Sequence, residues 1–285
     1  MSADKLFAGV FAMDTYFYTS LGAYAFDVRC EMLAELGYDA TYLTLWSAEA
    51  EADIPRLAYV KARYGLDVAG VYTTLDIASA PAGSAAHVLE LIETLPIPTQ
   101  VAVALYAEAP GRAQSDATLD NQALPWIERL LAVADRHGHE ILLYPHFAFW
   151  LERTEDAVRL CRRLAHPRLG LSFNGYHWYA VDGKQLSARL DEAAPYLRSA
   201  NICGSRRLPE GSEPMPATIE PLDDGELDNF IVLAELQRIG YRGWIGFQGY
   251  SVGGDVYIKL QRSLTAYRSM ITRLAKRPGW GVLGS

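Results

Sequence analysis

The chain has 285 residues, with 26 basic and 34 acidic side chains and a formal net charge of −8. Half of the residues are hydrophobic and 21% are charged, which provides material for a large buried core and excludes the disordered class. Because a negative net charge repels phosphate backbones, we expect no nucleic-acid partner.

The first apolar run in the chain, LFAGVFAM at 6–13, is too short and too poorly flanked by charge for a secretory signal, and it predicts a buried strand. No apolar stretch approaches the ~20 residues that a membrane helix requires. The three cysteines, Cys30, Cys161 and Cys203, form no CxxC pair, and their odd number is typical of reduced thiols. We therefore expect a soluble cytoplasmic protein with no membrane partner.

Runs of strand length alternate along the chain with longer helix-patterned segments, which indicates βα units and a parallel sheet. Eight such runs are found, at 6–13, 40–46, 67–73, 100–106, 140–144, 169–173, 199–203 and 244–248. Eight strands with intervening helices, in a chain of this length, predict an α/β fold in which residues 1–285 form a single (β/α)8 TIM-barrel domain.

The segment 26–36, FDVRCEMLAEL, is typical of the helices between these runs. Val28, Met32 and Leu36 recur at helical spacing and predict the buried stripe of this helix. Gly37 follows as a C-cap, because glycine accepts the left-handed conformation with which helices commonly end.

Two connections are longer than an ordinary βα loop. Segment 204–225 carries several Pro and Gly residues and follows the seventh strand, and segment 108–121 follows the fourth. Long loops on a rigid scaffold commonly carry function, so we expect 204–225 to lie over the barrel mouth.

The active face of such a barrel is built from the C-terminal ends of the strands. Here those ends are rich in aromatic and amide side chains and poor in carboxylates, and they include Tyr106, Tyr144, Asn174, Trp178, Asn201, Gln248 and Tyr250. Aromatic faces with amide and hydroxyl groups suit a polyhydroxylated ligand, so we expect a small-molecule sugar or sugar derivative as partner. The alternative for any single aromatic residue is that it fills the barrel core.

Four motifs in the second half of the chain carry a family resemblance: GHEILLYPH, LGLSFNGYHW, RSANICGS and GYRGWIGFQGY. With them the chain resembles the xylose-isomerase-like TIM barrels of the sugar phosphate isomerase and epimerase superfamily, through nearly the whole barrel. The resemblance implies that Glu, Asp, His and Glu at the ends of strands five to eight hold one divalent metal. The matching positions here are Tyr144, Asn174, Asn201 and Gln248, as in a subgroup with Asn and Gln in place of the acidic ligands.

The replacement of these ligands removes the charge and the imidazole that hold a hard divalent cation. We therefore expect no tightly bound metal or other cofactor. Asn and Gln keep the outline of Asp and Glu while adding NH₂ donors, so Asn174, Asn201 and Gln248 are candidate substrate-binding residues. The superfamily also includes endonuclease IV, but the acidic net charge and the missing ligands argue against a nuclease.

Two histidines match the family motifs. His177 keeps its place in the NxxH form of the strand-six motif, and His146 ends the strand-five motif. Both titrate near neutral pH, so with Tyr144 they are the candidate catalytic residues for proton transfer. The alternative is that a histidine at a strand end only caps loop carbonyls. The other histidines are expected on helix surfaces, at positions 87, 137, 139 and 166.

Further candidates lie in the loops. Arg207, next to Arg206 in segment 204–225, matches the region in which related epimerases place a substrate-binding arginine, and Trp178, Tyr106 and Tyr250 are candidate stacking residues. The alternative for each arginine is a solvated loop position. The carboxylates that could serve as bases are expected instead to be loop or cap residues: Asp14, Asp76, Glu108 and Glu220.

Three functional hypotheses follow. The first is a sugar-directed enzyme of isomerase or epimerase type, or a lyase on keto-sugars, with a degenerate metal site and histidine-based proton transfer, because metal-free aldose–ketose isomerisation lacks its main electrophile. The second is a non-catalytic sugar- or partner-binding barrel descended from an isomerase. The third keeps a metal through altered ligands that include His146 and His177. A homodimer is left open, since dimers are the commonest oligomers.

Overall fold

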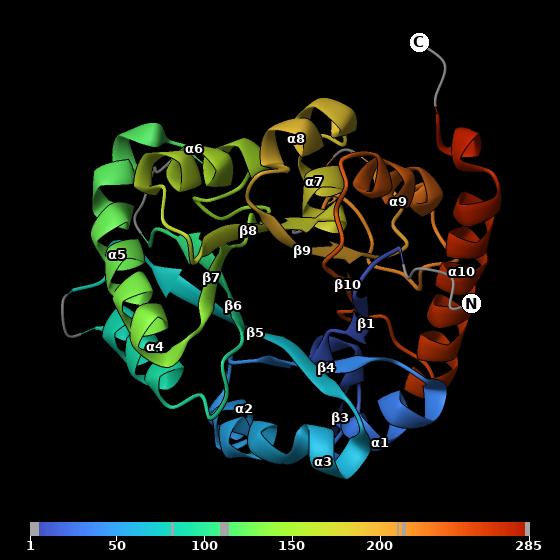
Figure 1. Cartoon of the computed structure of the whole chain (residues 1–285), viewed down its shortest axis with the longest axis horizontal. Coiled ribbons are helices and arrows are strands. Elements are labelled where there is room, and N and C mark those ends of the chain that lie inside the picture. Colours follow the sequence, from blue (N-terminus) through green and yellow to red (C-terminus); the bar gives the residue numbers. More distant parts are fainter. Residues whose placement is uncertain (1–5, 81–82, 109–113, 210, 213–214, 283–285) are drawn as a thin grey trace.

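The computed structural model of the chain describes all residues except 1–5, 81–82, 109–113, 210, 213–214 and 283–285. Parallel strands close into a barrel in the order β1-β10-β9-β8-β7-β6-β5-β4, and Phe11 of the first strand pairs with Ala40 to complete the ring (Figure 1). The strands are β1 (Gly9–Ala12), β4 (Ala40–Thr44), β5 (Asp67–Asp76), β6 (Gln100–Tyr106), β7 (Glu140–Leu143), β8 (Leu169–Asn174), β9 (Leu197–Ile202) and β10 (Trp244–Phe247). Each predicted run overlaps one strand, and the predicted (β/α)8 fold is confirmed.

Helices surround the barrel (Figure 1). They are α1 (Phe26–Leu36), α2 (Ala48–Ala52), α3 (Val60–Tyr64), α4 (Ser84–Glu93), α5 (Asp120–His137), α6 (Thr154–Leu164), α7 (Gly175–Val181), α8 (Leu186–Ala193), α9 (Asn229–Arg238) and α10 (Val256–Lys276). Short 3-10 helices add η1 (Asp14–Phe17), η2 (Ile54–Tyr59), η3 (Ala117–Leu119) and η4 (Pro278–Gly281). Within the described residues, no helix is long and apolar enough to cross a bilayer.

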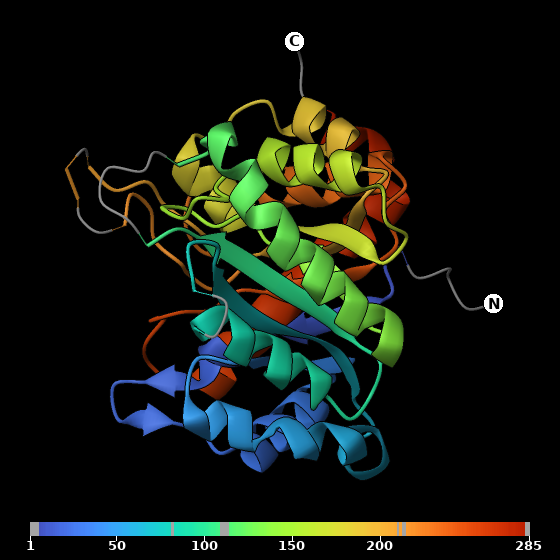
Figure 2. The same cartoon turned by 90° about the vertical axis from the view of Figure 1, so that its left-hand side faces the viewer.

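A small hairpin after β1 was not expected from the sequence. It consists of β2 (Tyr18–Thr19) and β3 (Gly22–Ala23), and Thr19 Oγ1 donates a 2.8 Å hydrogen bond to the carbonyl of Gly22. Strands of two residues are too short to show an alternating pattern. Figure 2 shows that this hairpin and the described parts of segment 204–225 project on the same side of the molecule, the side of the barrel mouth.

The interior of the barrel is filled by side chains. Aromatic residues alternate with small ones in this inner cluster, whose members are Phe11, Met13, Ala40, Tyr42, Ala69, Tyr72, Ala102, Ala104, Leu142 and Tyr144. The rings of Phe11 and Tyr42 stack at 4.9 Å between centroids. The barrel is therefore a packed core rather than a pore, and a ligand does not pass through it.

Helix α1 has the predicted bounds, and Gly37 ends it with φ 84°. The predicted stripe is only partly right. Met32 and Leu36 are partly buried and pack against the core, but Val28 is 37% exposed, and the fully buried apolar positions are Phe26, Cys30 and Leu33. The helix has apolar residues on two faces, and periodicity alone does not choose between them. Contacts with the barrel determine which face of α1 is buried. Cys30, like the other two cysteines, is a buried free thiol.

The prediction that the remaining histidines lie on the surface is wrong for His139. Its side chain is fully buried between the end of α5 and the start of β7, and its Nδ1 accepts a 3.2 Å hydrogen bond from the backbone N–H of Thr99. Burial lowers the pKa of His139. His87 and His166 are more exposed, and they lie beside Glu51 and Asp135.

An ion-pair network joins α6 to the α7–α8 connection. Asp182 accepts hydrogen bonds from Arg189 at 2.7 and 2.9 Å and from Arg153 at 2.7 Å. These bonds, those from Arg189 most of all, hold the pKa of Asp182 well below its usual value. Arg189, only 7% exposed, also contacts Glu155. This network thus joins the N-terminus of α6 to α8 through Asp182.

We expect Asp182→Asn to lower the free energy of unfolding by about 2 kcal/mol, because it leaves the buried Arg189 with too little negative charge. Urea unfolding at pH 7.5 measures the change. Asp191→Asn is the matched control, since Asp191 is a half-exposed partner of an exposed arginine and should contribute little. Equal stabilities of the two variants would contradict the prediction.

Candidate active site

Three of the predicted site residues meet through one amide group. Asn174, at the end of β8, donates hydrogen bonds from Nδ2 to the hydroxyl of Tyr144 and, at 2.7 Å, to Oε1 of Gln248. Its Oδ1 accepts the backbone N–H of His177 at 2.9 Å and caps α7. Because Oδ1 is held by this N–H donor, the orientation of the amide follows from its partners. All four residues are buried.

Asn201 joins this group from the neighbouring strand β9. Its Nδ2 lies 3.5 Å from Ser172 Oγ, while its buried Oδ1 has no hydrogen-bond partner among the described residues. Gly246 makes room for it, because a Cβ at that position would lie 2.0 Å from Asn201 Oδ1. The buried hydroxyl of Tyr72 is also without a described partner. Unpaired buried polar atoms are costly, so both atoms are suited to a ligand or an ordered water.

These residues do not fit a tightly bound divalent metal. The amide hydrogens of Asn174 are directed at the oxygens of Tyr144 and Gln248. A cation bound by these two oxygens would therefore lie against an N–H donor. Neutral amides and a phenol also provide no charge compensation. In the part of the chain that the structure describes, no group of three or more His, Cys, Asp or Glu residues is arranged to hold a metal ion.

His146 and His177 lie next to each other at the same mouth. Their ring centroids are 3.9 Å apart, and the ring of His177 contacts that of Tyr144 at 5.7 Å. Both rings are anchored on one residue: His177 Nδ1 accepts the backbone N–H of Phe147 at 3.1 Å, and His146 Nδ1 lies 2.7 Å from the Phe147 carbonyl oxygen. The structure thus brings the two predicted catalytic histidines together with Tyr144.

Burial keeps both imidazoles neutral. Burial lowers the pKa of His146 to about 4, and burial followed by the neighbouring His146 lowers the pKa of His177 well below its usual value. Burial also raises the pKa of the Tyr144 hydroxyl, so that group is protonated at neutral pH. Neutral imidazoles accept and donate protons through separate nitrogen atoms.

A continuous series of ring contacts runs along the mouth. From one side, Tyr106 contacts Phe149, and Phe149 stacks on His146 at 4.0 Å between centroids. On the other side the rings continue from Tyr144 through Tyr72, Trp46 and Tyr250. Trp46 and Tyr250 are 43% and 47% exposed, so both side chains can be reached from solvent. The predicted positions of Tyr106 and Tyr250 at the mouth agree with this arrangement.

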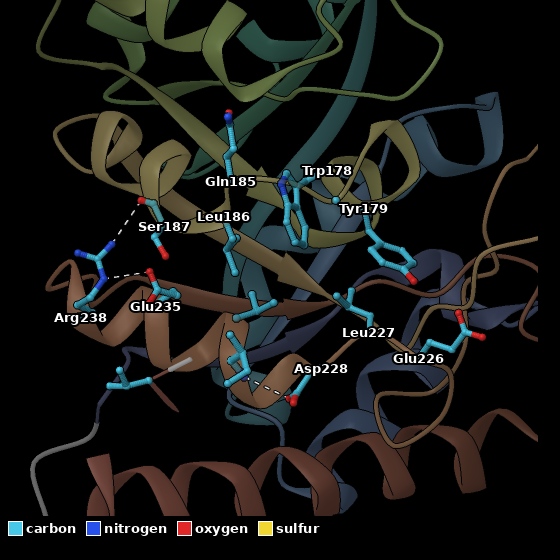
Figure 3. A pocket seen from close by; sticks show the side chains of 14 residues that line it. Trp178, Tyr179, Gln185, Leu186, Ser187, Glu226, Leu227, Asp228, Glu235 and Arg238 are labelled. Atoms are coloured by element: carbon cyan, nitrogen blue, oxygen red, sulfur yellow. Dashed lines mark hydrogen bonds and ion pairs between the residues drawn. The ribbon is translucent and has the colours of Figure 1, made fainter. Parts of the chain in front are cut away.

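Trp178 and Arg207 are placed elsewhere. Trp178 donates from Nε1 to the carbonyl of Lys184 and lines a cleft of about 630 Å³ among α7, α8 and α9, outside the barrel mouth (Figure 3). Arg207 lies over the ring of Tyr179 at 4.6 Å and donates to its carbonyl. Both side chains are held in these positions by local contacts that the strand ends do not reveal.

The carboxylates near the strand ends have structural partners, as expected. Asp14 is buried and accepts hydrogen bonds from Arg29 at 3.2 Å and from the backbone N–H of Thr44 at 2.9 Å. Asp76 accepts backbone N–H groups, including that of Glu108, and Glu220 accepts from Thr218 Oγ1. Asp14 still keeps one buried oxygen, Oδ1, without a partner among the described residues.

Sequence reasoning missed the part played by Phe147. It acts through its backbone N–H and carbonyl, and these groups are the same in every non-proline residue, so its identity gives no signal. Tyr72 and Trp46 could have been selected from their positions at strand ends, which are visible in the sequence.

A closed parallel barrel with polar groups gathered at the C-terminal ends of its strands defines the class of α/β-barrel proteins that hold ligands at this end. A family model described as xylose isomerase-like TIM barrel matches residues 30–267. The chain belongs to this family, which confirms the resemblance seen in the sequence.

Individual relatives are distant. The chain is 27% identical over 133 residues to a 2-oxo-tetronate isomerase from Pectobacterium atrosepticum, an alignment that covers 42% of this chain and 45% of the relative. The chain thus spans less than half the length of this curated relative.

Solved structures match over nearly the whole chain. An L-ribulose 3-epimerase superposes with a TM-score of 0.74 at 16% identity, covering 97% of this chain and 98% of the other. The IOLI protein with a bound zinc atom gives a TM-score of 0.73 at 13% identity, covering 93% and 98%. A 3-keto-D-glucoside 4-epimerase from E. coli gives 0.67 at 15% identity, covering 85% and 93%. At these identities the likeness shows the fold.

Proposed function

We propose that this protein is a sugar-directed enzyme of isomerase or epimerase type that works without a tightly bound divalent metal. The observation that carries the proposal is the contact of two imidazoles, His146 and His177, whose ring centroids are 3.9 Å apart at the barrel mouth. The backbone N–H of His177 also donates to the amide oxygen of Asn174. The names of the similar proteins support the choice of substrate class, since one is named 2-oxo-tetronate isomerase and two are named as epimerases, of L-ribulose and of a 3-keto-D-glucoside.

The lining of the mouth suits the hydroxyl groups and CH faces of a sugar. Asn201 Oδ1 and the Tyr72 hydroxyl are free of partners among the described residues, and together they offer an acceptor and a donor. Tyr106 and Tyr250 supply aromatic faces at opposite ends of the ring contacts. We assign substrate binding to these groups with Asn174 and Gln248, and we leave out Trp178 and Arg207 because of their other contacts.

The chemistry that this site supports is removal of a proton next to a carbonyl group. Isomerases, epimerases and lyases of keto-sugars share this first step. A neutral imidazole with a free nitrogen lone pair is a suitable base, and hydrogen-bond donors at the carbonyl oxygen stabilise the charge that develops there. The residues that do this here are His146, His177 and Tyr144.

The test is exchange of substrate hydrogen with solvent deuterium. Protein treated with EDTA, with its metal content measured by plasma mass spectrometry, is incubated in D₂O with aldoses, ketoses and 2-oxo sugar acids, and proton NMR follows the loss of C–H signals. We expect exchange by metal-free protein. Saturable binding without exchange would favour a non-catalytic barrel, and exchange only after addition of Mn²⁺ or Zn²⁺ would favour a metal enzyme with altered ligands. Either outcome contradicts the proposal.

A further inference from the structure

The backbone of Phe147 determines which nitrogen of each histidine carries the proton. Its N–H can only donate, so His177 Nδ1 accepts and the ring proton of His177 is on Nε2. Its carbonyl can only accept, so His146 Nδ1 carries the proton and His146 Nε2 has a lone pair. The two neutral rings are therefore opposite tautomers, with one Nε2 able to take a proton and the other able to give one.

A tight turn holds Phe147 in this position. The N–H of His146 donates to the Leu151 carbonyl at 2.9 Å, and the N–H of Ala148 donates to Glu152 Oε1 at 3.0 Å. Ala148 has φ 67°, a left-handed conformation that costs energy in a residue with a Cβ. A backbone kept in such a conformation by its surroundings is a rigid support for the two imidazoles.

The two rings form one contact pair, so we infer that they face a ligand from the same side. Their centroids are 3.9 Å apart with the ring planes tilted by 39°, which is van der Waals contact, so no part of a sugar fits between them. Epimerisation by proton transfer needs one group to remove the proton from one face and another to return it to the opposite face. A shift of a proton between neighbouring carbons needs only groups on one face.

The other titratable groups that face the pair are poor bases. Tyr144 of the β7 end and Tyr176 of α7 contact the ring of His177, and burial raises the pKa of both hydroxyls. Tyr176 also donates to the carbonyl of Ala217. Asp14 keeps a buried Oδ1 without a described partner, and Asp76 accepts backbone N–H groups. Among the described residues, however, the contacts of the two imidazoles include no carboxylate, so no second base faces the pair.

We propose that His146 Nε2 is the base and His177 Nε2–H the donor on one face of the substrate, and that the reaction is an isomerisation between neighbouring carbons rather than an epimerisation. This inference rests on the proposed function and narrows it to one reaction type. The substrate class is a sugar or sugar acid with a carbonyl next to a hydroxyl-bearing carbon.

The proton balance closes without a co-reactant. His146 Nε2 takes the proton from the hydroxyl-bearing carbon, and the electron pair of the C–H bond becomes a C=C bond while the carbonyl oxygen takes up negative charge. His177 gives its Nε2 proton to that oxygen and takes the proton of the neighbouring hydroxyl. The imidazolium of His146 then returns its proton to the former carbonyl carbon, which leaves both histidines as they began.

The tautomers can be tested without any substrate. In protein labelled with ¹⁵N in its histidine rings, two-bond ¹H–¹⁵N correlation spectra at pH 7.5 distinguish Nδ1–H from Nε2–H rings. We expect an Nδ1–H signal that is lost in His146→Gln and an Nε2–H signal that is lost in His177→Gln. His139, whose Nδ1 accepts the Thr99 N–H, is an internal Nε2–H reference. An Nε2–H form or an imidazolium at His146 would overturn the assignment.

The reaction type is tested by the product formed in D₂O. We expect one deuterium in a single stereochemical position on the former carbonyl carbon, with no epimer whose carbonyl has kept its place. Such an epimer as the main product would overturn the inference while leaving the proposed function intact. Lack of exchange with every ligand would instead overturn the proposed function, whatever the tautomers of the two histidines are.

Discussion

Replacing His177 by Asn should lower kcat by about 10²–10⁴-fold, the usual contribution of one positioned proton-transfer group. An asparagine side chain brings an oxygen close to the position of Nδ1, so it can still accept the N–H of Phe147. It has no counterpart to Nε2, the atom that we assign to the reaction. We expect ligand affinity to change little, because the lost interaction is strongest in the transition state.

The turnover assay for this variant is paired with calorimetric measurement of ligand binding. His87→Asn is the matched control, since His87 lies on α4 with its side chain 55% exposed and should tolerate the change without loss of activity. Wild-type turnover in His177→Asn would exclude His177 from the chemistry. A matching loss in His146→Asn, which keeps a donor for the Phe147 carbonyl but removes the base, is expected from the same arrangement.

Stability should fall as the pH is lowered below ~6.5, the ordinary pKa of histidine in an unfolded chain. Burial lowers the pKa of His139, His146 and His177 in the folded protein, so below that pH the unfolded chain binds protons that the folded chain does not. The free energy of unfolding is therefore unaffected by these histidines above their unfolded pKa. It decreases as the pH falls from the unfolded pKa toward the folded pKa. For His146, with a folded pKa of about 4, the loss reaches about 3 kcal/mol at pH 4.

Urea unfolding between pH 7.5 and pH 5.0 measures this effect, and His146→Gln separates it from other titrations. The free energy of unfolding of the variant should depend less steeply on pH, by about 1.4 kcal/mol per unit well below pH 6.5. Asp14 contributes with the opposite sign, because burial raises its pKa, but its contribution is common to both proteins and cancels in the comparison. Parallel curves for wild type and variant would show that His146 is not kept neutral by the fold.

Much of the barrel could be predicted because strands are local features. The apolar run at 244–248 became β10 (Trp244–Phe247), and the run at 100–106 became β6 with the same bounds. Strand ends in a parallel barrel all point to one face, so the predicted meeting of Tyr144, Asn174 and Gln248 followed from their positions alone. The hairpin β2–β3 was not predicted, because strands of two residues are too short to show an alternating pattern of apolar and polar residues.

Side-chain direction was much harder to predict. Trp178 and Arg207 follow strands β8 and β9, where residues of the barrel mouth are expected. Trp178 nevertheless donates to the carbonyl of Lys184, and Arg207 donates to the carbonyl of Tyr179. His139 was expected on the surface because it follows a helix end, but packing of α5 against β7 buries it. In each case the contact partner is distant in the sequence or reached through loop backbone, which hydrophobic periodicity does not describe.

The sequence by itself determined the barrel, its open end and the neutral character of the residues at that end, because strand periodicity and residue type are properties of short segments. Only the tertiary structure decided that Asn174 joins Tyr144 to Gln248, that α1 buries Cys30 rather than Val28, and that the N–H of Phe147 contacts one histidine while its carbonyl contacts the other. Those outcomes depend on the closure of the sheet and on the backbone of the turn after β7, which bring donors and acceptors from separate segments within hydrogen-bonding distance.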